Sequence, residues 1–378
     1  MIKTPDNRMA TDRPVALAER ESAPDPQPDS QTRGGAIRPN KTTDRRQARW
    51  RTRNVPAATR YTDAEAPWRG RVALMLAAGV ALALAGCATR AAPSAPSAPA
   101  VPAAAASPTT KVLMIMEENH EYGDIIGDPE ARYINQLASR YGTARRVDAG
   151  YPRSCPSLAA YILLTSGSTH GICDDKAPKY HPLTGDNLFH QVAASGREWR
   201  DYAESAPGTC VLANAHQGRY LVRHVPAAYY TLERAECAKW AVPLGQAAAG
   251  ALHTDVATGN LPAFGLVSPD ACHDMHGAAP CPLSRTANGD RWLQDWIPQI
   301  LAGPDYRAGH LVVIITWDEG SGADNHIPTL VIASGTNHVT ADEPYTHCST
   351  LRTVEDLLRL PALGCARTTH SMISAFRL

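Results

Sequence analysis

The sequence predicts an α/β domain over residues 110–378, and three observations lead to this prediction. First, four short segments are almost wholly apolar, which is typical of strands that are covered on both faces of a sheet. Second, segments with a helical pattern of apolar residues lie among them. Third, ionisable side chains follow three of the strands directly. The predicted strands are Val112–Met116, Phe264–Val267, Leu311–Thr316 and Thr329–Ala333, and the predicted helices are Tyr133–Tyr141, Leu158–Thr165, Asn187–Ser195, Gly289–Leu301 and Ser349–Leu358.

The charges of the 378-residue chain are unevenly distributed, although its formal net charge is zero. Residues 1–71 hold 15 of the 37 Lys and Arg but 9 of the 37 Asp and Glu, which leaves 22 basic and 28 acidic residues for 72–378. A domain with an acidic balance lacks the basic surface that non-specific nucleic-acid binding requires. We therefore expect no nucleic-acid partner.

An export signal is predicted at residues 67–87. Arg69 and Arg71 precede an apolar run, Val72–Ala85, which is shorter than the roughly 20 residues of a membrane-spanning helix and is typical of a secretory signal. The run ends in Leu-Ala-Gly-Cys87, which resembles the box at which bacterial lipoproteins are lipidated. The alternative is an ordinary signal with a chance cysteine. Because such signals normally begin a chain, we expect residues 1–66 to be a non-native or disordered leader that is absent from the mature protein.

The rest of the N-terminal part is a linker, because residues 88–109 are rich in Pro, Ala and Ser and cannot form a core. We thus expect a protein that is anchored to the membrane through lipid only, on the periplasmic or extracellular face of the cell envelope.

Eight cysteines follow Cys87, and an even number in an exported chain predicts disulfides. Pairing of neighbours along the chain is our first expectation because each pair closes a short loop, although eight cysteines allow 105 pairings. A zinc cluster is the alternative, but no C-x-x-C pair is present. The eight are Cys155, Cys173, Cys210, Cys237, Cys272, Cys281, Cys348 and Cys365.

The segments that follow three predicted strands suggest one shared site. Val112–Met116 is followed by Glu117-Glu118-Asn119, Phe264–Val267 by "SPDACHDMH", and Leu311–Thr316 by "WDEGSGADNH". In open α/β sheets, ligands bind just beyond the carboxyl ends of the strands. We therefore expect these acids and histidines to meet at one edge of the sheet.

Ser157 is the candidate nucleophile. It precedes the predicted helix Leu158–Thr165, which Gly167 closes, so its hydroxyl would lie beside free backbone N–H groups at the positive end of the helix dipole. The alternative is that Ser157 only caps the helix, which is the usual role of such a serine.

Asp318 and Glu319 form an adjacent acidic pair, and two carboxylates that come together repel unless a cation joins them. Oxygen-rich ligand sets favour Mg, Ca or Mn. A solvated turn is the alternative. Other polar candidates are Asp274 and His276, which lie between Cys272 and Cys281, His326 before a strand, and His347 before a helix.

In their order, these motifs resemble the bacterial phosphoesterase family that holds secreted acid phosphatases and phosphatidylcholine-type phospholipases C, within the alkaline phosphatase superfamily. The resemblance spans about residues 111–360 and implies an alkaline-phosphatase-like fold, with a central, mostly parallel sheet and helices on both faces. The matching segments are "EENHEYGDIIG", "PSLAAYILLTSGSTHGI", "YAESAPGTC", "VRHVPAAYY", "SPDACHDMH", "GDRWLQDW", "ITWDEG", "NHIPTLVI" and "THCSTLRTVEDLL".

The resemblance also implies residue roles. Ser157 matches the nucleophile, and the metal-binding set, which also holds Ser157, matches Glu118, Asn119, Asp318 and Glu319. A His near the phosphate matches His224, and polar positions of the same pocket match Asp274, His276, His326 and His347. The implied cofactor is one divalent ion. The chain departs from the family pattern at Cys155, Ala159 and Ala160, where the family usually has His, Pro and Asn.

These roles predict a metal-dependent phosphatase of the acid phosphatase type that forms a phosphoserine on Ser157. His276 or His326 would protonate the leaving alkoxide. The expected partner is a small phosphorylated substrate or a phospholipid head group. Two alternatives are a phospholipase C-like phosphodiesterase and a lipoprotein that binds a phosphorylated ligand without turnover.

We expect the mature protein to begin at a lipid-modified Cys87, because the segment before it has the composition of a lipoprotein signal. Mass spectrometry of the mature N-terminus measures this, and Cys87→Ser should abolish the lipid modification. An unprocessed chain that begins at Met1 would contradict the prediction.

Overall fold

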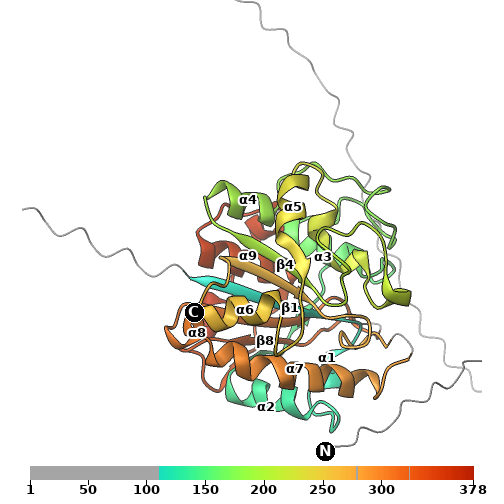
Figure 1. Cartoon of the computed structure of the whole chain (residues 1–378). Helices are drawn as coiled ribbons and strands as arrows, with labels where there is room; N and C mark the ends of the chain where they lie inside the picture. Colours follow the sequence, from blue (N-terminus) through green and yellow to red (C-terminus); the bar gives the residue numbers. More distant parts are fainter. Residues whose placement is uncertain (1–109, 278–279, 323) are drawn as a thin grey trace, which may run out of the picture. The chain divides into compact units, whose positions relative to one another are not determined.

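An eight-stranded sheet forms the centre of the domain (Figure 1). The computed structural model describes residues 110–277, 280–322 and 324–378, so the predicted leader, signal, Cys87 and linker lie outside the described residues. Along the sheet the strands are β5 (Ala241–Pro243), β4 (Trp199–Ala203), β6 (Phe264–Ser268), β1 (Lys111–Glu117), β7 (Leu311–Trp317), β8 (Thr329–Ile332), β2 (Gly142–Ala144) and β9 (Val339–Ala341). Two further short strands, β3 (Val147–Asp148) and β10 (Tyr345–Thr346), pair with each other.

The sheet is mostly parallel, since β8 is the one strand of these eight that runs against its neighbours. Strand β1 lies between β6 and β7, with Ile115 opposite Val267 and Glu117 opposite Trp317. The carboxyl ends of these three strands therefore meet at one edge. This arrangement confirms the predicted α/β fold class and the four predicted strands.

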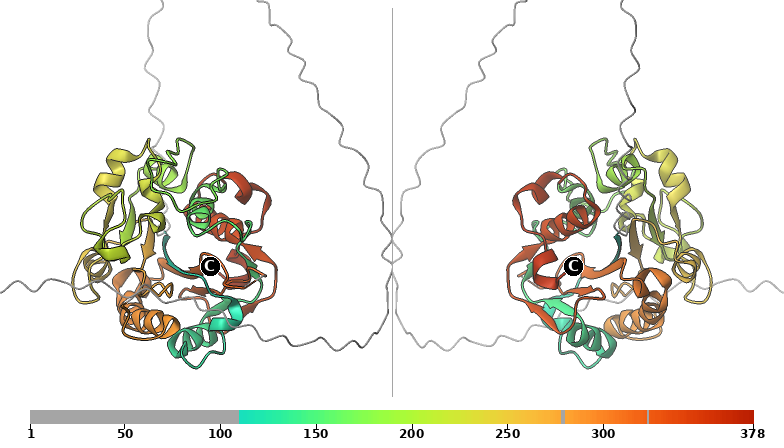
Figure 2. Two further views of the ribbon diagram at one scale, coloured as in Figure 1. Left: turned by 90° about the vertical axis from the view of Figure 1, so that its right-hand side faces the viewer. Right: turned by 90° about the vertical axis from the view of Figure 1, so that its left-hand side faces the viewer.

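Helices cover both faces of the sheet (Figures 1 and 2). One face carries α3 (Leu158–Ser166), α4 (Leu188–Ala194), α5 (Arg234–Trp240) and α9 (His347–Leu358), and the other carries α2 (Arg132–Arg140), α6 (Ala251–Thr258), α7 (Arg285–Ala302) and α8 (Pro304–Arg307). The five predicted helices correspond to α2, α3, α4, α7 and α9 within a few residues. Shorter elements are α1 (Tyr122–Ile125), α10 (Ile373–Phe376), η1 (His216–Gly218), η2 (Val222–His224), η3 (Pro226–Ala228) and η4 (Gly364–Thr368).

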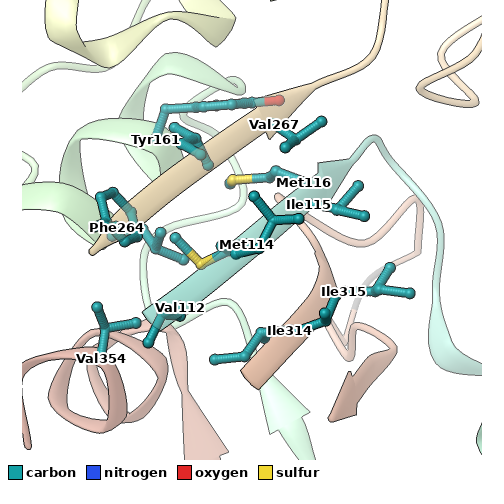
Figure 3. Close-up of a cluster of buried hydrophobic side chains, with 14 of the residues drawn as sticks. Val112, Met114, Ile115, Met116, Tyr161, Phe264, Val267, Ile314, Ile315 and Val354 are labelled. Carbon is teal, nitrogen blue, oxygen red and sulfur yellow. The ribbon is translucent and has the colours of Figure 1, made fainter. Parts of the chain in front are cut away.

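The core explains why the central strands are continuously apolar. Residues 112–116 of β1 are at most 1% exposed, because helices lie above and below the strand. Figure 3 shows Met114 of β1 among side chains of the neighbouring strands, with Tyr161 of α3 and Val354 of α9 over one face. A strand that is covered on both faces has no position at which a polar side chain would meet water.

Helix α3 is packed tightly enough to fix its first residue. Every residue of Leu158–Ser166 is buried. The helix ends at Gly167, whose φ of 73° is in the left-handed region and whose position a side chain could not occupy, because a Cβ would lie 2.5 Å from the carbonyl oxygen of Leu363. Glycine is the residue that accepts both constraints without strain.

Four disulfides join cysteines that are neighbours along the chain, as the first expectation predicted. The pairs are Cys155–Cys173, Cys210–Cys237, Cys272–Cys281 and Cys348–Cys365. The first pair ties the segment before α3 to the loop after it, and the last ties the start of α9 to η4.

Within the residues that the structure describes, no helix has the length and apolar character needed to cross a bilayer.

We expect titration of the unfolded, unreduced protein to find essentially no free thiol among the eight cysteines after Cys87. Replacing Cys348 and Cys365 with Ala should lower the free energy of unfolding by about 2–5 kcal/mol or somewhat less, because the cost is largest in small domains. Denaturant unfolding of the variant and the wild type measures the difference. Two or more free thiols per chain would contradict the pairing.

Candidate active site

Two buried carboxylates lie at the carboxyl edge of the sheet. Glu118 follows β1 and Asp318 follows the adjacent strand β7, and both residues are 0% exposed. The backbone N–H of Asp318 donates to the carbonyl oxygen of Glu117 at 2.9 Å, which continues the pairing of the two strands. The register of the parallel strands therefore brings the two acids together, as the sequence predicted for this edge.

The hydroxyl of Ser157 turns toward these acids. Ser157 stands at the N-terminus of α3 and is 3% exposed, but its side chain makes no capping hydrogen bond. Instead its Oγ donates to Oε2 of Glu118 at 3.1 Å. The interpretation of Ser157 as a plain helix cap is therefore wrong, because its side chain accepts no hydrogen bond from the first turn of α3. The N–H of Leu158 donates instead to Oδ1 of Asp175 at 3.1 Å.

Burial makes the ionised forms of Glu118 and Asp318 unfavourable. Desolvation raises the pKa of Glu118 to about 7, although the nearby charge of Arg223 opposes the shift. Desolvation and the neighbouring Glu118 raise the pKa of Asp318 well above its usual range. Two carboxylates in this setting are stable only if a proton or a cation offsets their repulsion.

Unused oxygen atoms around the pair fit a metal ion. Among the buried side-chain atoms of the described residues that have no hydrogen-bond partner are Glu118 Oε1, Asn119 Oδ1 and Asp318 Oδ2. Asn119 is held in place by its own N–H, which donates to Asp318 Oδ1 at 3.0 Å, and by its Nδ2, which donates to Glu319 Oε1 at 3.2 Å. Buried polar atoms rarely stay unpaired, so this oxygen-rich group could hold a hard cation.

His224 and Asp274 lie on the other side of Glu118. His224 Nε2 is 2.7 Å from Glu118 Oε1, yet neither atom is aligned for a hydrogen bond. Asp274 Oδ2 is 3.5 Å from His224 Nδ1, and the ring of His224 stacks on Tyr161 with the centroids 4.9 Å apart. Ligand atoms of Glu118, His224 and Asp274 all lie within 4.8 Å of one another, so this group could also hold a metal. An imidazole ligand adds zinc to the ions that suit the site.

The three remaining predicted histidines occupy different places. Nε2 of the buried His347 donates to the carbonyl oxygen of Asp318 at 2.6 Å, and burial lowers the His347 pKa to about 4. The backbone N–H of His276 donates to Asp274 Oδ1 at 2.7 Å, and the pKa of His276 is lowered to about 4 by burial and by the nearby charge of Arg223. Both residues thus adjoin the acids.

His326 points elsewhere. Its ring stacks on Tyr122 at 4.9 Å, and its Nε2 lies 2.7 Å from the carbonyl oxygen of Arg145. Its backbone N–H donates to Oε2 of Glu121 at 2.9 Å, and within the described part of the chain none of its contacts is with Glu118, Asp318 or Glu319. The structure therefore does not bring His326 into the group that the sequence analysis assembled.

Three residues that the sequence analysis did not select join this group. The hydroxyl of Tyr151 donates to Glu319 Oε2 at 3.1 Å. Arg223 Nε forms an ion pair with Asp175 Oδ2 at 3.2 Å. A weak signal was present for each partner of this pair, because Arg223 adjoins His224 and Asp175 follows Cys173, whose disulfide reaches the segment before Ser157.

A second group of ligand-type side chains, Glu204, Asp270 and His273, lies nearby. Here the groups bond to one another: His273 Nδ1 is 2.9 Å from Glu204 Oε2, and Arg219 Nε donates to Asp270 Oδ2 at 2.8 Å. The arginine, together with His273 when it is protonated, offsets the two carboxylates, so this group can be balanced without an ion.

A cleft of about 620 Å³ opens beside the carboxylate group. The residues that line it include Asn119, Asp124, Asp128, Arg285 and Ser321. The cleft gives a ligand of head-group size a place next to the buried acids.

Comparisons with known proteins agree with this geometry. The model of the Phosphoesterase family matches residues 130–361. A phosphatidylinositol-3-phosphatase of Mycobacterium tuberculosis (strain ATCC 25618 / H37Rv) is 28% identical over 261 residues, which cover 68% of this chain and 79% of that protein.

Solved structures also align with the chain. A protein in the alkaline phosphatase superfamily from Vibrio parahaemolyticus has 10% identity and a TM-score of 0.48, with 71% of this chain and 72% of that one covered. The phosphonate monoester hydrolase of Silicibacter pomeroyi has 12% identity and a TM-score of 0.40, with 71% and 76% covered. By its family match, which spans more than half of its length, the chain belongs to the Phosphoesterase family and is a hydrolase of phosphoric esters.

Proposed function

We propose that this protein hydrolyses phosphate monoesters, as an acid phosphatase does, through a phosphoserine on Ser157. The observation that carries the proposal is the hydrogen bond from the Ser157 hydroxyl to Glu118, because it takes the hydroxyl away from the capping role. A serine that is buried beside acids and at a helix N-terminus has a proton acceptor on one side and backbone donors on the other.

The proton of Ser157 has a defined acceptor. Glu118 Oε2 accepts the hydroxyl hydrogen and takes the proton as Ser157 Oγ attacks phosphorus. A new O–P bond forms while the bond from phosphorus to the alcohol oxygen breaks. Water then attacks the phosphoserine, inorganic phosphate leaves, and Ser157 recovers its proton from Glu118.

His276 is our candidate for the proton that the departing alkoxide needs. Its backbone N–H donates to Asp274 Oδ1, whereas Nε2 of His326 lies 2.7 Å from the carbonyl oxygen of Arg145. His276 gives up this proton and takes one back from the attacking water.

A divalent ion is expected at Glu118, Asn119, Asp318 and Glu319, with Ser157 beside it, and Mg, Ca or Mn suits this oxygen-rich set. When bound, such an ion lowers the pKa of a coordinated hydroxyl and offsets charge on phosphoryl oxygens. Meanwhile His347 holds the backbone of Asp318, and Tyr151 holds Glu319 in a fixed orientation.

The relative from Mycobacterium tuberculosis supports the choice of substrate class, because its name describes a phosphatase that acts on a phosphorylated lipid head group. A small phosphate ester or such a head group would enter through the cleft beside Asn119. With the predicted lipid anchor, we place the enzyme on the outer side of a cell membrane.

The test is an assay of the full chain with p-nitrophenyl phosphate and with p-nitrophenyl phosphorylcholine, each with and without a chelator. We expect hydrolysis of the monoester, loss of activity with the chelator and recovery with a divalent ion. Preferred hydrolysis of the diester would indicate a phospholipase C-like enzyme instead. Phosphate binding without hydrolysis of either ester would indicate a binding protein.

Ser157→Ala should lower kcat for the monoester by roughly a thousandfold or more, because the covalent step loses its nucleophile. The bound metal should stay near the wild-type amount, since the carboxylate and amide ligands remain. A phosphatase assay beside metal analysis of the same sample measures both. Near-normal turnover would place the chemistry elsewhere in the domain.

Asp318→Asn should lose metal and activity together, because a neutral amide cannot replace a buried charged ligand. The matched control is Asp305→Asn, since Asp305 is also a buried carboxylate but pairs with Lys111 at the opposite end of β1. We expect the control to keep its metal content. Full metal occupancy in Asp318→Asn would remove Asp318 from the ligand set.

A further inference from the structure

The carboxylate of Asp175 lies between a backbone donor and the guanidinium of Arg223, beside the proposed nucleophile. Its Oδ1 accepts a hydrogen bond from the N–H of Leu158 at 3.1 Å, and its Oδ2 lies 3.2 Å from Nε of Arg223. Leu158 directly follows Ser157, so one of the two donors lies one residue from the proposed nucleophile. The bridged space is therefore within reach of the Ser157 hydroxyl.

Arg223 belongs to the same side of the site. It lies in η2, which packs against α3, and its neighbour His224 stacks on Tyr161 of α3 and approaches Glu118. His224 Nε2 lies 2.7 Å from Glu118 Oε1, and Oε2 of the same carboxylate accepts the hydrogen bond of the Ser157 hydroxyl. Arg223 is thus the chain neighbour of a side chain that reaches the carboxylate bound to Ser157.

A disulfide holds the segments that carry Ser157 and Asp175 together. Cys155 and Cys173 are bonded, and Ser157 and Asp175 each lie two residues beyond one of these cysteines. The Asp175 side chain is 34% exposed, compared with 13% for Arg223. The carboxylate can thus turn toward solvent, while the guanidinium stays largely buried beside α3.

The two donors that hold Asp175 are the kinds that bind phosphoryl oxygens. A backbone N–H at a helix N-terminus and an arginine are both common in phosphate sites. A carboxylate that bridges such donors has the charge and the two acceptor oxygens that a phosphoryl group would present to them. Since one pair of donors cannot serve two anions at full strength, substrate and Asp175 compete.

We propose that the Leu158 N–H and Arg223 bind phosphoryl oxygens of the substrate, and that the Asp175 carboxylate fills this anion site until the substrate displaces it. The assignment of the bound group as the one that Ser157 attacks rests on the proposed function. Arg223 is then a substrate-binding residue, and Asp175 sets how tightly phosphate binds.

A purely structural role for Asp175, as a cap of α3 supplied from another segment, makes different predictions. A cap contributes to the stability of the fold and does not oppose phosphate binding. Asp175→Asn separates the two roles, because the amide oxygen can still accept the Leu158 N–H while the negative charge is lost. Asp174→Asn is a matched control, since Asp174 is 35% exposed in the same loop but pairs with Lys176 and His181.

The experiment measures the Kd of inorganic phosphate by calorimetry on the full chain, and KM and kcat for p-nitrophenyl phosphate, at fixed metal and salt. Asp175→Asn should lower Kd and KM about three- to tenfold with little change in kcat, because a partly exposed competing charge is removed. Arg223→Gln should raise Kd and KM roughly ten- to a hundredfold, and Arg223→Lys should recover part of this loss. Asp174→Asn should behave as the wild type.

The double variant Asp175→Asn/Arg223→Gln should gain little over Arg223→Gln alone, because both residues act on one anion site. Unchanged or weaker phosphate binding in Asp175→Asn, with a lower Tm, would overturn the proposal and leave Asp175 as a cap. Failure of the proposed function looks different: the wild type would bind phosphate with the same response to these variants but hydrolyse no ester. A wild type that binds no phosphate would overturn both.

Discussion

The structure of the site depends on the electrostatic repulsion between the carboxylates of Glu118 and Asp318. The parallel pairing of β1 and β7 brings these two residues close together. Neither residue is exposed, so water cannot screen the two charges. The surrounding groups offset this repulsion by donating hydrogen bonds to the two carboxylates. Backbone N–H groups of Asn119 and Glu319 donate to one oxygen of Asp318, and Ser157 donates to Glu118. The oxygens that remain unpaired are those that a cation would satisfy, which is why an unfavourable pair can be kept at this edge of the sheet.

The fold provides the rigidity that such a pair requires. The carboxylates follow strands that are buried on both faces, and a shift of either strand would move apolar side chains out of the core. Helix α3 is fully buried and ends where Gly167 meets Leu363, so its first turn has little freedom. Ala159 and Ala160, where the family usually has Pro and Asn, lie inside this buried helix at 0% exposure. Their small side chains can contribute packing there but no polar contact, so the helix offers phosphate only its backbone.

The sequence predicted the parts of the structure that local pattern determines. Continuous apolar runs identified β1, β6, β7 and β8, and the acids after them identified the edge that holds the site. Strand β4 was missed because its five residues, WRDYA, include charged side chains that no apolar run would contain. His326 was assigned to the site because it ends the segment after β7 and matches a pocket position of the family. It does precede β8, whose start lies at this edge because β8 runs antiparallel to β7, but its Nε2 lies 2.7 Å from the carbonyl oxygen of Arg145. The Arg223–Asp175 contact depends on a disulfide pairing that sequence leaves open.

The charge of a phosphate ester would have to be balanced in this pocket by a bound cation and by Arg223. A phosphate monoester carries negative charge toward a pocket that already contains Glu118, Asp318 and Asp274, so binding would be opposed unless positive charge is near. A cation among the carboxylates would offset part of this repulsion, and in the proposed anion site Arg223 would supply a fixed positive charge. Without Asp175, the guanidinium of Arg223 would be a largely buried charge without a partner. Its pairing with Asp175 avoids that cost in the free enzyme, and because Asp175 is the more exposed partner, the pair can open toward solvent when a stronger anion arrives.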